Sequence, residues 1–479
     1  MAQLLGIDIG TTATKALLID EHGAVLGKAS AEYPLSTPKP HWSEQDPELW
    51  WQATSSCLSQ LGVWRPDAIG FSGQMHGAVF LDADGVVIRP AILWNDQRTA
   101  AECDEIEARI GEARIRQITR SPMLTGFQLP KLIWLRNHEP AAYARLRHLL
   151  LPKDFVRMRL SGELMSDVSD ASGTGLFDVA ERRWSDEIIQ GLDLDAAILP
   201  NVVESIAPTG CTAAGSGLEA GVPIFAGGGD QAASAVGVGA VVPGVVSVSL
   251  GTSGVVFTSI ERPDFDPSGR THTFCHANGA WHAMGVMLSC GGALRWYRDT
   301  FYPGKPYAAL DESASLSQPG ALGATFLPYL AGERCPYHDP DATGAFFGLT
   351  LAHRSPDLAR AVLEGVTFGL RDVMGCLQEL GGDTHRVRVA GGGAKSAFWM
   401  QLMADILGEE CVTIECEEGP ALGAAMLAGV GVGVWPSVSA ASAAIVREAN
   451  SYKPSGVDYS EAYRRYRELY RKTSATSGV

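Results

Sequence analysis

Two turns of the same composition, Gly10–Thr11–Thr12 and Gly251–Thr252–Ser253, constrain the fold of this chain more than any other feature. Each turn follows a largely apolar run, 4–9 in one case and 245–250 in the other, and precedes a second run, which is the pattern of a β-hairpin. Glycine lets a phosphate oxygen approach the backbone, and successive amide groups and threonine hydroxyls can then donate hydrogen bonds to it. The repetition predicts two related lobes that hold one polyphosphate.

The first turn belongs to a predicted β-meander, with strands over 3–9, 14–20 and 24–33. Asp8 ends the first of these strands, where a carboxylate can hold Mg²⁺ through water beside nucleotide phosphates. Lys15 can add a positive charge to the same place. Taken alone, the segment is equally consistent with an ordinary hairpin whose acid and lysine are solvated.

A second acid follows a buried strand in the middle of the chain. The run 224–226 leads into the glycines 227–229, which present Asp230 and Gln231 ahead of a helix of small residues over 232–238. A carboxylate at this position has little local reason to exist unless it takes part in chemistry. The alternative is that Asp230 caps the helix, which is the more frequent use of aspartate after glycine.

A third glycine cluster, Gly391–Gly393, ends a predicted strand over 387–390 and opens a helix. This geometry suits close approach by a nucleotide, with Ser396 on the following helix. It is not a Walker motif, because Ala394 precedes Lys395 where that motif requires glycine.

Length and composition set further limits. A chain of 479 residues exceeds the roughly 250 to 300 residues at which single cores stop growing, so two domains are expected. The net charge of −16 argues against a nucleic-acid or anionic-membrane binder. Nine cysteines without a CxxC pair, no evident signal peptide and no uninterrupted apolar span predict a cytoplasmic protein that does not cross a membrane.

Helices are predicted over 47–61 and from Gln97 to Ile110, the latter capped by Asp96. The glycine-rich segment 215–223 gives the best boundary signal, so we divide the chain into lobes over 1–221 and 222–436. The remaining segment, 437–479, is predicted to be a helical tail that packs back on the lobes.

Read in order, these motifs resemble those of the FGGY carbohydrate kinases, over nearly the whole length. Segment 6–12 is similar to the family's first phosphate loop, 249–254 to its second, 390–394 to its adenosine loop, and 229–231 to the segment that bears its catalytic aspartate. The resemblance implies two actin-like, ribonuclease-H-like α/β lobes around a central cleft, the first binding sugar and the second nucleotide. It also implies a homodimer.

Within the family the chain is most similar to the xylulokinase branch, because Ser72–Gly77 matches that branch's sugar-site motif. The resemblance implies substrate contacts by Met75, His76, Trp94, Asp96 and Gln231. Core packing and a helix cap are the alternatives for these side chains. Glu333 and Arg334, in a loop similar to the family's Gly-Glu-Arg loop, are at least as consistent with a structural ion pair as with a catalytic role.

The activity that the resemblance implies is transfer of the ATP γ-phosphoryl group to D-xylulose, giving D-xylulose 5-phosphate. Asp230 is then the general base, and Asp8 and Asp230 hold Mg²⁺ through water. The implied nucleotide ligands are Thr11, Thr12, Lys15, Gly251, Thr252, Gly392, Gly393 and Ser396. The alternatives are a kinase for ribulose, fuculose, rhamnulose or glycerol, and a non-catalytic actin-like nucleotide sensor.

Overall fold

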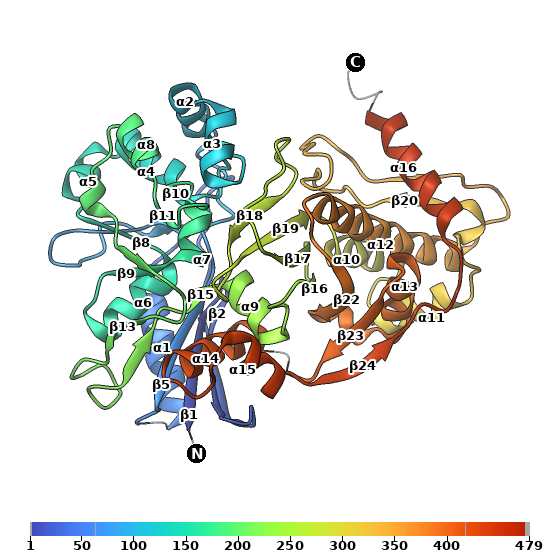
Figure 1. Ribbon diagram of the computed structural model, residues 1–479. Helices are drawn as coiled ribbons and strands as arrows, with labels where there is room; N and C mark the ends of the chain where they lie inside the picture. Colours follow the sequence, from blue (N-terminus) through green and yellow to red (C-terminus); the bar gives the residue numbers. More distant parts are fainter. Residues whose placement is uncertain (1, 63, 417, 475–479) are drawn as a thin grey trace.

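The computed structural model describes residues 2–62, 64–416 and 418–474, and it contains two large β-sheets flanked by helices (Figure 1). We call the part built on the sheet that contains β1 the first lobe and the part built on the sheet that contains β16 the second lobe. The first sheet is formed by β1 Gln3–Ile9, β2 Ala13–Asp20, β3 Val25–Glu32, β5 Ala68–Gly73, β13 Pro208–Cys211, β14 Pro223–Phe225 and β15 Gly228–Gly229. The predicted meander is thus confirmed to within one residue at each end.

The second sheet is also seven-stranded. It is formed by β16 Gly244–Leu250, β17 Gly254–Ile260, β18 His272–Cys275, β19 Trp281–Met287, β22 Thr384–Ala390, β23 Glu410–Ile414 and β24 Glu448–Tyr452. Shorter strands are β4 Glu44–Gln45, β6 Val79–Leu81, β7 Ala91–Ile92, β8 His148–Leu150, β9 Met165–Asp167, β10 Phe177–Asp178, β11 Arg183–Trp184, β12 Asn201–Val203, β20 Thr325–Leu327 and β21 Ala345–Phe347.

The two sheets share one topology. In the first, β3, β2 and β1 are antiparallel neighbours, followed by β5 and β14 parallel to β1 and by the antiparallel β13. In the second, β19, β17 and β16 are followed by the parallel β22 and β23 and by the antiparallel β24. The order and directions of these six strands correspond in the two sheets, which confirms the two related lobes predicted from the repeated turns.

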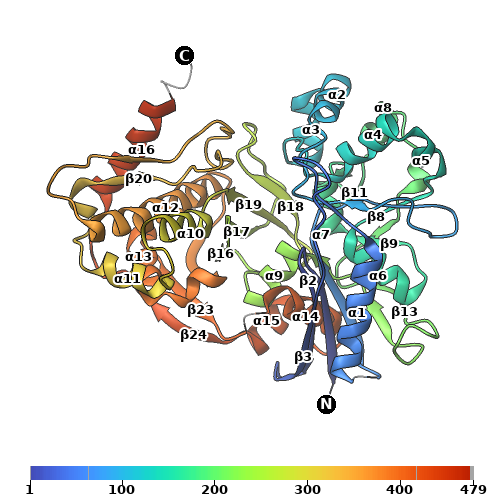
Figure 2. The same ribbon diagram turned by 180° about the vertical axis from the view of Figure 1, so that it is seen from behind.

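Helices cover both sheets (Figures 1 and 2). Those of the first lobe are α1 Pro47–Leu61, α2 Ala100–Ile110, α3 Glu112–Thr119, α4 Gln128–His138, α5 Pro140–Arg145, α6 Pro152–Ser161, α7 Val168–Ala171, α8 Asp186–Gly191 and α9 Asp230–Val238. Those that follow β19 are α10 Gly291–Phe301, α11 Tyr307–Ser315, α12 Ser355–Glu379, α13 Ala397–Leu407, α14 Gly419–Gly431, α15 Val438–Ile445 and α16 Ser460–Ser474.

Helix α14 returns to the first lobe late in the chain and lies against α9, β1 and β5 (Figure 1). Glycines make the approach of α9 and α14 close. A Cβ atom on Gly423 would stand 1.8 Å from the carbonyl oxygen of Ala233, and one on Gly237 would stand 2.0 Å from that of Gly419. No side chain fits at either position, so the two helices meet backbone to backbone next to the turn that carries Asp230.

The structure differs from the sequence-based division of the chain in two respects. Strands β14 and β15 pair with β5, so the first sheet continues past residue 221, where we had divided the lobes. Within the segment 437–479, α15 lies against α9 and α14, β24 pairs with β23, and α16 packs on α12 and β20. This segment therefore contains a strand as well as the expected helices.

The helix predicted from Gln97 begins three residues later, at Ala100, and Asp96 does not cap it. Instead, the Asp96 carboxylate accepts hydrogen bonds from the Ser43 amide at 2.6 Å and from the Arg98 guanidinium at 2.7 Å. A buried carboxylate gains more from a charge-assisted pair with arginine than from one helix amide. Within the described residues, no helix is long and apolar enough to span a lipid bilayer.

Candidate active site

Asp8 and Asp230 lie at the same edge of the first sheet. Asp8 is the penultimate residue of β1, which is parallel to β5, and Asp230 directly follows β15, which is also parallel to β5. Gly229 and Ile9 both pair with Gly73, so the two acids emerge two strands apart, with backbones roughly 10 Å from each other. The carboxyl ends of neighbouring parallel strands thus bring together two acids that the sequence separates widely.

Burial and neighbouring negative charge disfavour the ionisation of both carboxyl groups. Burial raises the pKa of Asp8 to about 6, against the lowering effects of the neighbouring Ser72 hydroxyl and of the positive charge of Lys15. Burial and the nearby Asp8 raise the pKa of Asp230 to about 7. Carboxyl groups with raised pKa values in one site are suited to proton transfer or to binding a cation.

The residues present fit a divalent cation. The Asp8 Oδ1 atom is buried and has no hydrogen-bond partner among the described residues, which leaves a lone pair for a cation or a water molecule bound to one. Within the same residues, no three acidic, histidine or cysteine side chains gather as a closed metal site. This donor set suits Mg²⁺, which keeps several waters and shares substrate phosphates with one or two carboxylates.

Four side chains fix the first glycine-threonine turn. The Tyr33 hydroxyl donates to the Gly10 carbonyl at 2.6 Å, and the Gln45 amide donates to the Thr11 carbonyl at 2.7 Å. The other two contacts come from Gln74, which donates to the Gly10 carbonyl at 3.2 Å, and from Trp94, which donates to the Thr11 hydroxyl at 3.0 Å. The carbonyl groups of Gly10 and Thr11 are thus bound by side chains of the protein, whereas Thr12 is exposed.

Lys15 lies beside this turn but has a protein partner. Its ammonium group is 2.8 Å from the carboxylate of Glu418, which immediately precedes α14. The pair joins β2 to the start of α14, and both side chains are partly exposed. A phosphate contact by Lys15 would compete with this ion pair.

Of the predicted sugar residues, Met75 packs against the Asp230 turn and His76 packs against Gly173. A Cβ atom on Gly229 would stand 2.9 Å from the Met75 side chain, and one on Gly173 would stand 2.5 Å from the His76 ring. His76 Nδ1 lies 2.6 Å from the Gly173 carbonyl oxygen, and the ring lies against Phe127. Met75 is buried, whereas His76 is partly exposed.

The electrostatics of His76 determine how it can bind a ligand. Burial, with smaller contributions from the charges of Lys131 and Arg334, lowers its pKa to about 3. The ring is therefore neutral near pH 7, and the contact with Gly173 places its proton on Nδ1. Nε2 then keeps a lone pair, which can accept a hydrogen bond from a hydroxyl group.

The other predicted sugar residues differ in accessibility. Trp94 is 46% exposed and reaches Thr11, so it joins the proposed sugar region to the phosphate turn. Gln231 directly follows Asp230, and its backbone and side-chain N–H groups favour the ionised form of the Asp230 carboxylate. Asp96 is fully buried and paired with Arg98, so its carboxylate does not line an open site.

Glu333 and Arg334 do not form the ion pair considered from the sequence. The Glu333 carboxylate accepts hydrogen bonds from the backbone amides of Leu288, at 2.9 Å, and Arg334, at 2.7 Å. Burial raises the pKa of this carboxyl group to about 7, although both amides oppose the shift. Its contacts therefore stabilise the loop after β19.

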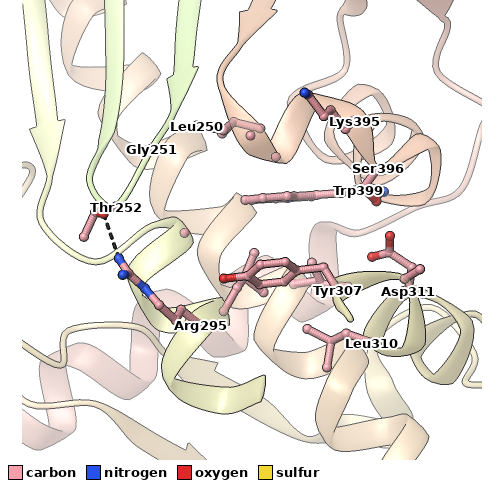
Figure 3. Close-up of a pocket in the computed structure, with 16 residues that line it drawn as sticks. Leu250, Gly251, Thr252, Arg295, Tyr307, Leu310, Asp311, Lys395, Ser396 and Trp399 are labelled. Carbon is pink, nitrogen blue, oxygen red and sulfur yellow. Dashed lines mark hydrogen bonds between the residues drawn. The ribbon is translucent and has the colours of Figure 1, made fainter. Parts of the chain in front are cut away.

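The second glycine-threonine turn borders a cavity of about 620 Å³ in the second lobe (Figure 3). The cavity wall includes the predicted nucleotide ligands Gly251, Thr252, Gly392, Gly393 and Ser396. The Ser396 hydroxyl accepts a hydrogen bond from the Trp399 amide and so caps α13. The cavity is therefore bordered by two motifs, the turn at Gly251 and the cluster at Gly391, which lie about 140 residues apart in the sequence.

Sequence reasoning missed much of this cavity wall, including Arg295, Tyr307, Asp311 and Trp399. Arg295 donates to the Thr252 hydroxyl at 2.9 Å, at the opposite end of the cavity from Asp311 (Figure 3). Burial raises the pKa of Asp311, against a hydrogen bond from Ser396. These residues stand on α10, α11 and α13, outside the glycine motifs recognised in the sequence, so only the tertiary structure reveals that they line the cavity.

The glycines of the third cluster serve different purposes. A Cβ atom on Gly393 would stand 2.4 Å from the Trp399 ring, so packing excludes a side chain there. A Cβ atom on Gly392 would meet nothing within 4 Å. Gly392 therefore borders the open part of the cavity, and Gly393 lets Trp399 form its wall.

Two lobes of one topology, a pair of acids at a sheet edge and a cavity beside a glycine-threonine turn define the fold and site of a two-lobed sugar kinase. The models of the FGGY family of carbohydrate kinases match this chain, the N-terminal domain over residues 3–237 and the C-terminal domain over 246–432. The chain belongs to this family and is a phosphotransferase.

Several known proteins are similar over nearly the whole length. The xylulose kinase of Escherichia coli is 43% identical, with 98% of each chain covered. A solved structure of a xyloylose kinase from Brucella ovis is 38% identical, with a TM-score of 0.93, and the match covers 99% of this chain and 100% of that one. The gluconokinase of Bacillus subtilis is 33% identical over 88% of this chain and 86% of its own.

Proposed function

We propose that this kinase transfers the γ-phosphoryl group of ATP to O5 of D-xylulose. The observation that carries the proposal is the packing of Met75 against Gly229, which brings the sugar motif next to the strand end that presents Asp230. Relatives named xylulose kinase, at 43%, 40% and 37% identity, support this acceptor. The gluconokinase relative makes gluconate the first competing acceptor to test.

In the proposed mechanism Asp230 accepts the proton of the attacking hydroxyl group. The ordinary pKa of a carboxyl group is far below that of an alcohol, so this transfer occurs late, when the hydroxyl has become acidic in the transition state. The raised pKa of Asp230, about 7, makes its carboxylate a stronger base than an ordinary aspartate and places its pKa near neutral pH. The N–H groups of Gln231 favour the ionised form of the Asp230 carboxylate, which is the form that accepts the proton.

The sugar is held by groups of complementary chemistry. His76 accepts a hydrogen bond from a sugar hydroxyl through Nε2, and the Trp94 face covers C–H groups. Because Asp96 is buried, we assign it a positioning role: its Ser43 and Arg98 contacts fix the segment that carries Trp94.

The nucleotide occupies the cavity of the second lobe, with its phosphates toward Thr252 and Arg295 and its adenosine toward Gly392, Tyr307 and Asp311. Amides and hydroxyls of Thr11, Thr12 and Thr252 bind the phosphate oxygens between the lobes. Asp8 and Asp230 would hold Mg²⁺ through water, and the ion when bound would offset charge on the phosphates.

The proposed function is tested by coupled ADP release with ATP, Mg²⁺ and a panel of D-xylulose, D-ribulose, L-ribulose, L-fuculose, L-rhamnulose, glycerol and gluconate. We expect kcat/KM for D-xylulose to exceed that for each other acceptor by at least about tenfold, or roughly 1.4 kcal/mol. Preference for gluconate or another polyol would keep the phosphotransferase and overturn the acceptor. ADP release that no acceptor stimulates would contradict the proposal as a whole.

A further inference from the structure

A fully buried group of charged side chains lies behind the turn that presents Asp230. Lys153 is its centre, with its ammonium group 2.7 Å from Asp154, 2.8 Å from Asp167 and 3.5 Å from Asp170. All four side chains have no exposed surface, and Arg157 pairs with Asp154 at 3.1 Å. Charges are retained in a protein interior only when they are paired, and nothing in the proposed chemistry so far uses these five.

One line of contacts joins this group to the turn. The Gly229 amide donates a hydrogen bond to the Ser169 hydroxyl oxygen at 3.1 Å, and that hydroxyl donates to Asp167 Oδ2 at 2.6 Å. The same Oδ2 atom accepts the Ser169 amide at 2.8 Å and the Ser205 hydroxyl at 3.0 Å. The remaining oxygen of Asp167 faces Lys153, so the residue before Asp230 is tied to the buried ion group through a single serine.

Packing reinforces this line of contacts. A Cβ atom on Gly228 would stand 2.9 Å from the Ser169 hydroxyl, and one on Gly73 would stand 2.9 Å from the Lys153 side chain. Gly73 of β5 pairs with Gly229 of β15. Lys153 and Ser169 therefore pack against the two neighbouring strands that lead to the turn. Met75 contacts Gly229 as well, and together these contacts leave the turn little freedom to shift.

We propose that Ser169 and Asp167 are positioning residues for Asp230: with Lys153 they fix the Gly228–Gly229 turn so that the carboxylate is held where the acceptor hydroxyl will lie. This inference rests on the proposed role of Asp230 as base. A misplacement of about 1 Å can cost on the order of 100-fold in rate, so one hydrogen bond behind the turn has a measurable effect on catalysis.

The obvious variant, Lys153→Met, leaves three buried carboxylates with too few cations and so destabilises the whole fold, and the test therefore uses two serines. Ser169→Ala removes the link between Gly229 and Asp167. Ser166→Ala is the matched control, because Ser166 is equally buried and donates to Asp154 at 2.6 Å, but its side chain makes no hydrogen bond to the turn among the described residues.

We expect Ser169→Ala to lower kcat by about 10- to 100-fold while the KM values for ATP and D-xylulose stay within about twofold of the wild type. Ser166→Ala should keep kcat within about twofold, and the two variants should show similar losses in Tm. An unchanged kcat for Ser169→Ala, or equal losses of kcat in both variants, would overturn the inference. A wild-type protein without sugar-dependent turnover would instead refute the proposed function, so the two failures are distinguishable.

Discussion

The Trp94 indole N–H donates a hydrogen bond to the Thr11 hydroxyl at 3.0 Å, which joins a predicted sugar residue to a predicted phosphate residue. Trp94→Phe keeps an aromatic face but loses this donor. A hydrogen bond contributes about 0.5–1.5 kcal/mol, so we expect kcat/KM for both substrates to fall by about three- to tenfold. Steady-state kinetics with each substrate varied in turn will measure this, and unchanged values for ATP would show that the contact does not couple the two regions.

Asp230→Asn should nearly abolish transfer while ATP still binds. General base catalysis contributes about 10²- to 10⁴-fold, and an amide cannot accept the proton. Coupled ADP release measures turnover, and titration calorimetry measures the Kd for ATP, which should stay within about threefold. The control is Asp186→Asn, an exposed aspartate at the start of α8 that pairs with Arg183. Turnover of Asp230→Asn at the wild-type rate would exclude this residue as the base.

The pH profile follows from the same carboxyl group. Because the protonated form of Asp230 cannot accept a proton, and its pKa is raised to about 7, activity should be lost as the pH falls through 7. Below that point we expect kcat/KM to decrease about tenfold per pH unit, and above it to level off. An acid limb with its midpoint near 4, the ordinary value for aspartate, would mean that the burial and the Asp8 charge seen here do not act on the base.

His76→Gln tests the acceptor role assigned to Nε2. The variant loses a ring nitrogen that the Gly173 contact orients, so we expect the KM for D-xylulose to rise about 10- to 100-fold, with the KM for ATP unchanged. The control is His138→Gln, a half-exposed histidine that contacts Glu102 on the outer side of α4. Equal KM values for the sugar in the wild type and His76→Gln would remove His76 from the sugar site.

Arg295→Gln tests the orientation of the nucleotide. Charge-assisted hydrogen bonds to phosphate are about twice as strong as neutral ones, so loss of the guanidinium at the Thr252 end of the cavity should raise the KM for ATP about 5- to 20-fold. The KM for the sugar should not change. An unaltered KM for ATP would place the phosphates elsewhere along the cavity.

The sequence predicts the parts of this protein that depend on local backbone geometry. The two glycine-threonine turns, the meander over β1 to β3 and the acid at residue 230 follow from strand periodicity and glycine placement. The repetition of the turns also predicts the two related lobes, and the family resemblance adds the central cleft between them. Asp96 is different. The local sequence predicts a helix cap, whereas in the folded protein its carboxylate is bound by the backbone amide of the distant Ser43 and by the Arg98 guanidinium.

The cavity wall and the buried charged group could not be predicted in this way. The cavity wall includes Arg295, Tyr307 and Asp311, which lie on helices whose sequences are typical of solvent-exposed faces. Only the packing of these helices brings the three side chains to the same cavity as Gly251 and Gly392. Likewise, Lys153 and Asp167 sit on separate elements with ordinary local sequences. Their contact depends on how α6, β9 and β15 meet.

The most direct test of the account is identification of the product by ³¹P and ¹H NMR after incubation of the wild-type protein with ATP, Mg²⁺ and D-xylulose. We predict a phosphate monoester whose phosphorus couples to the two protons on C5, formed together with one equivalent of ADP, and no such signal with Asp230→Asn. A phosphorus signal coupled to C1 protons, or ADP and inorganic phosphate without any sugar ester, would contradict the account.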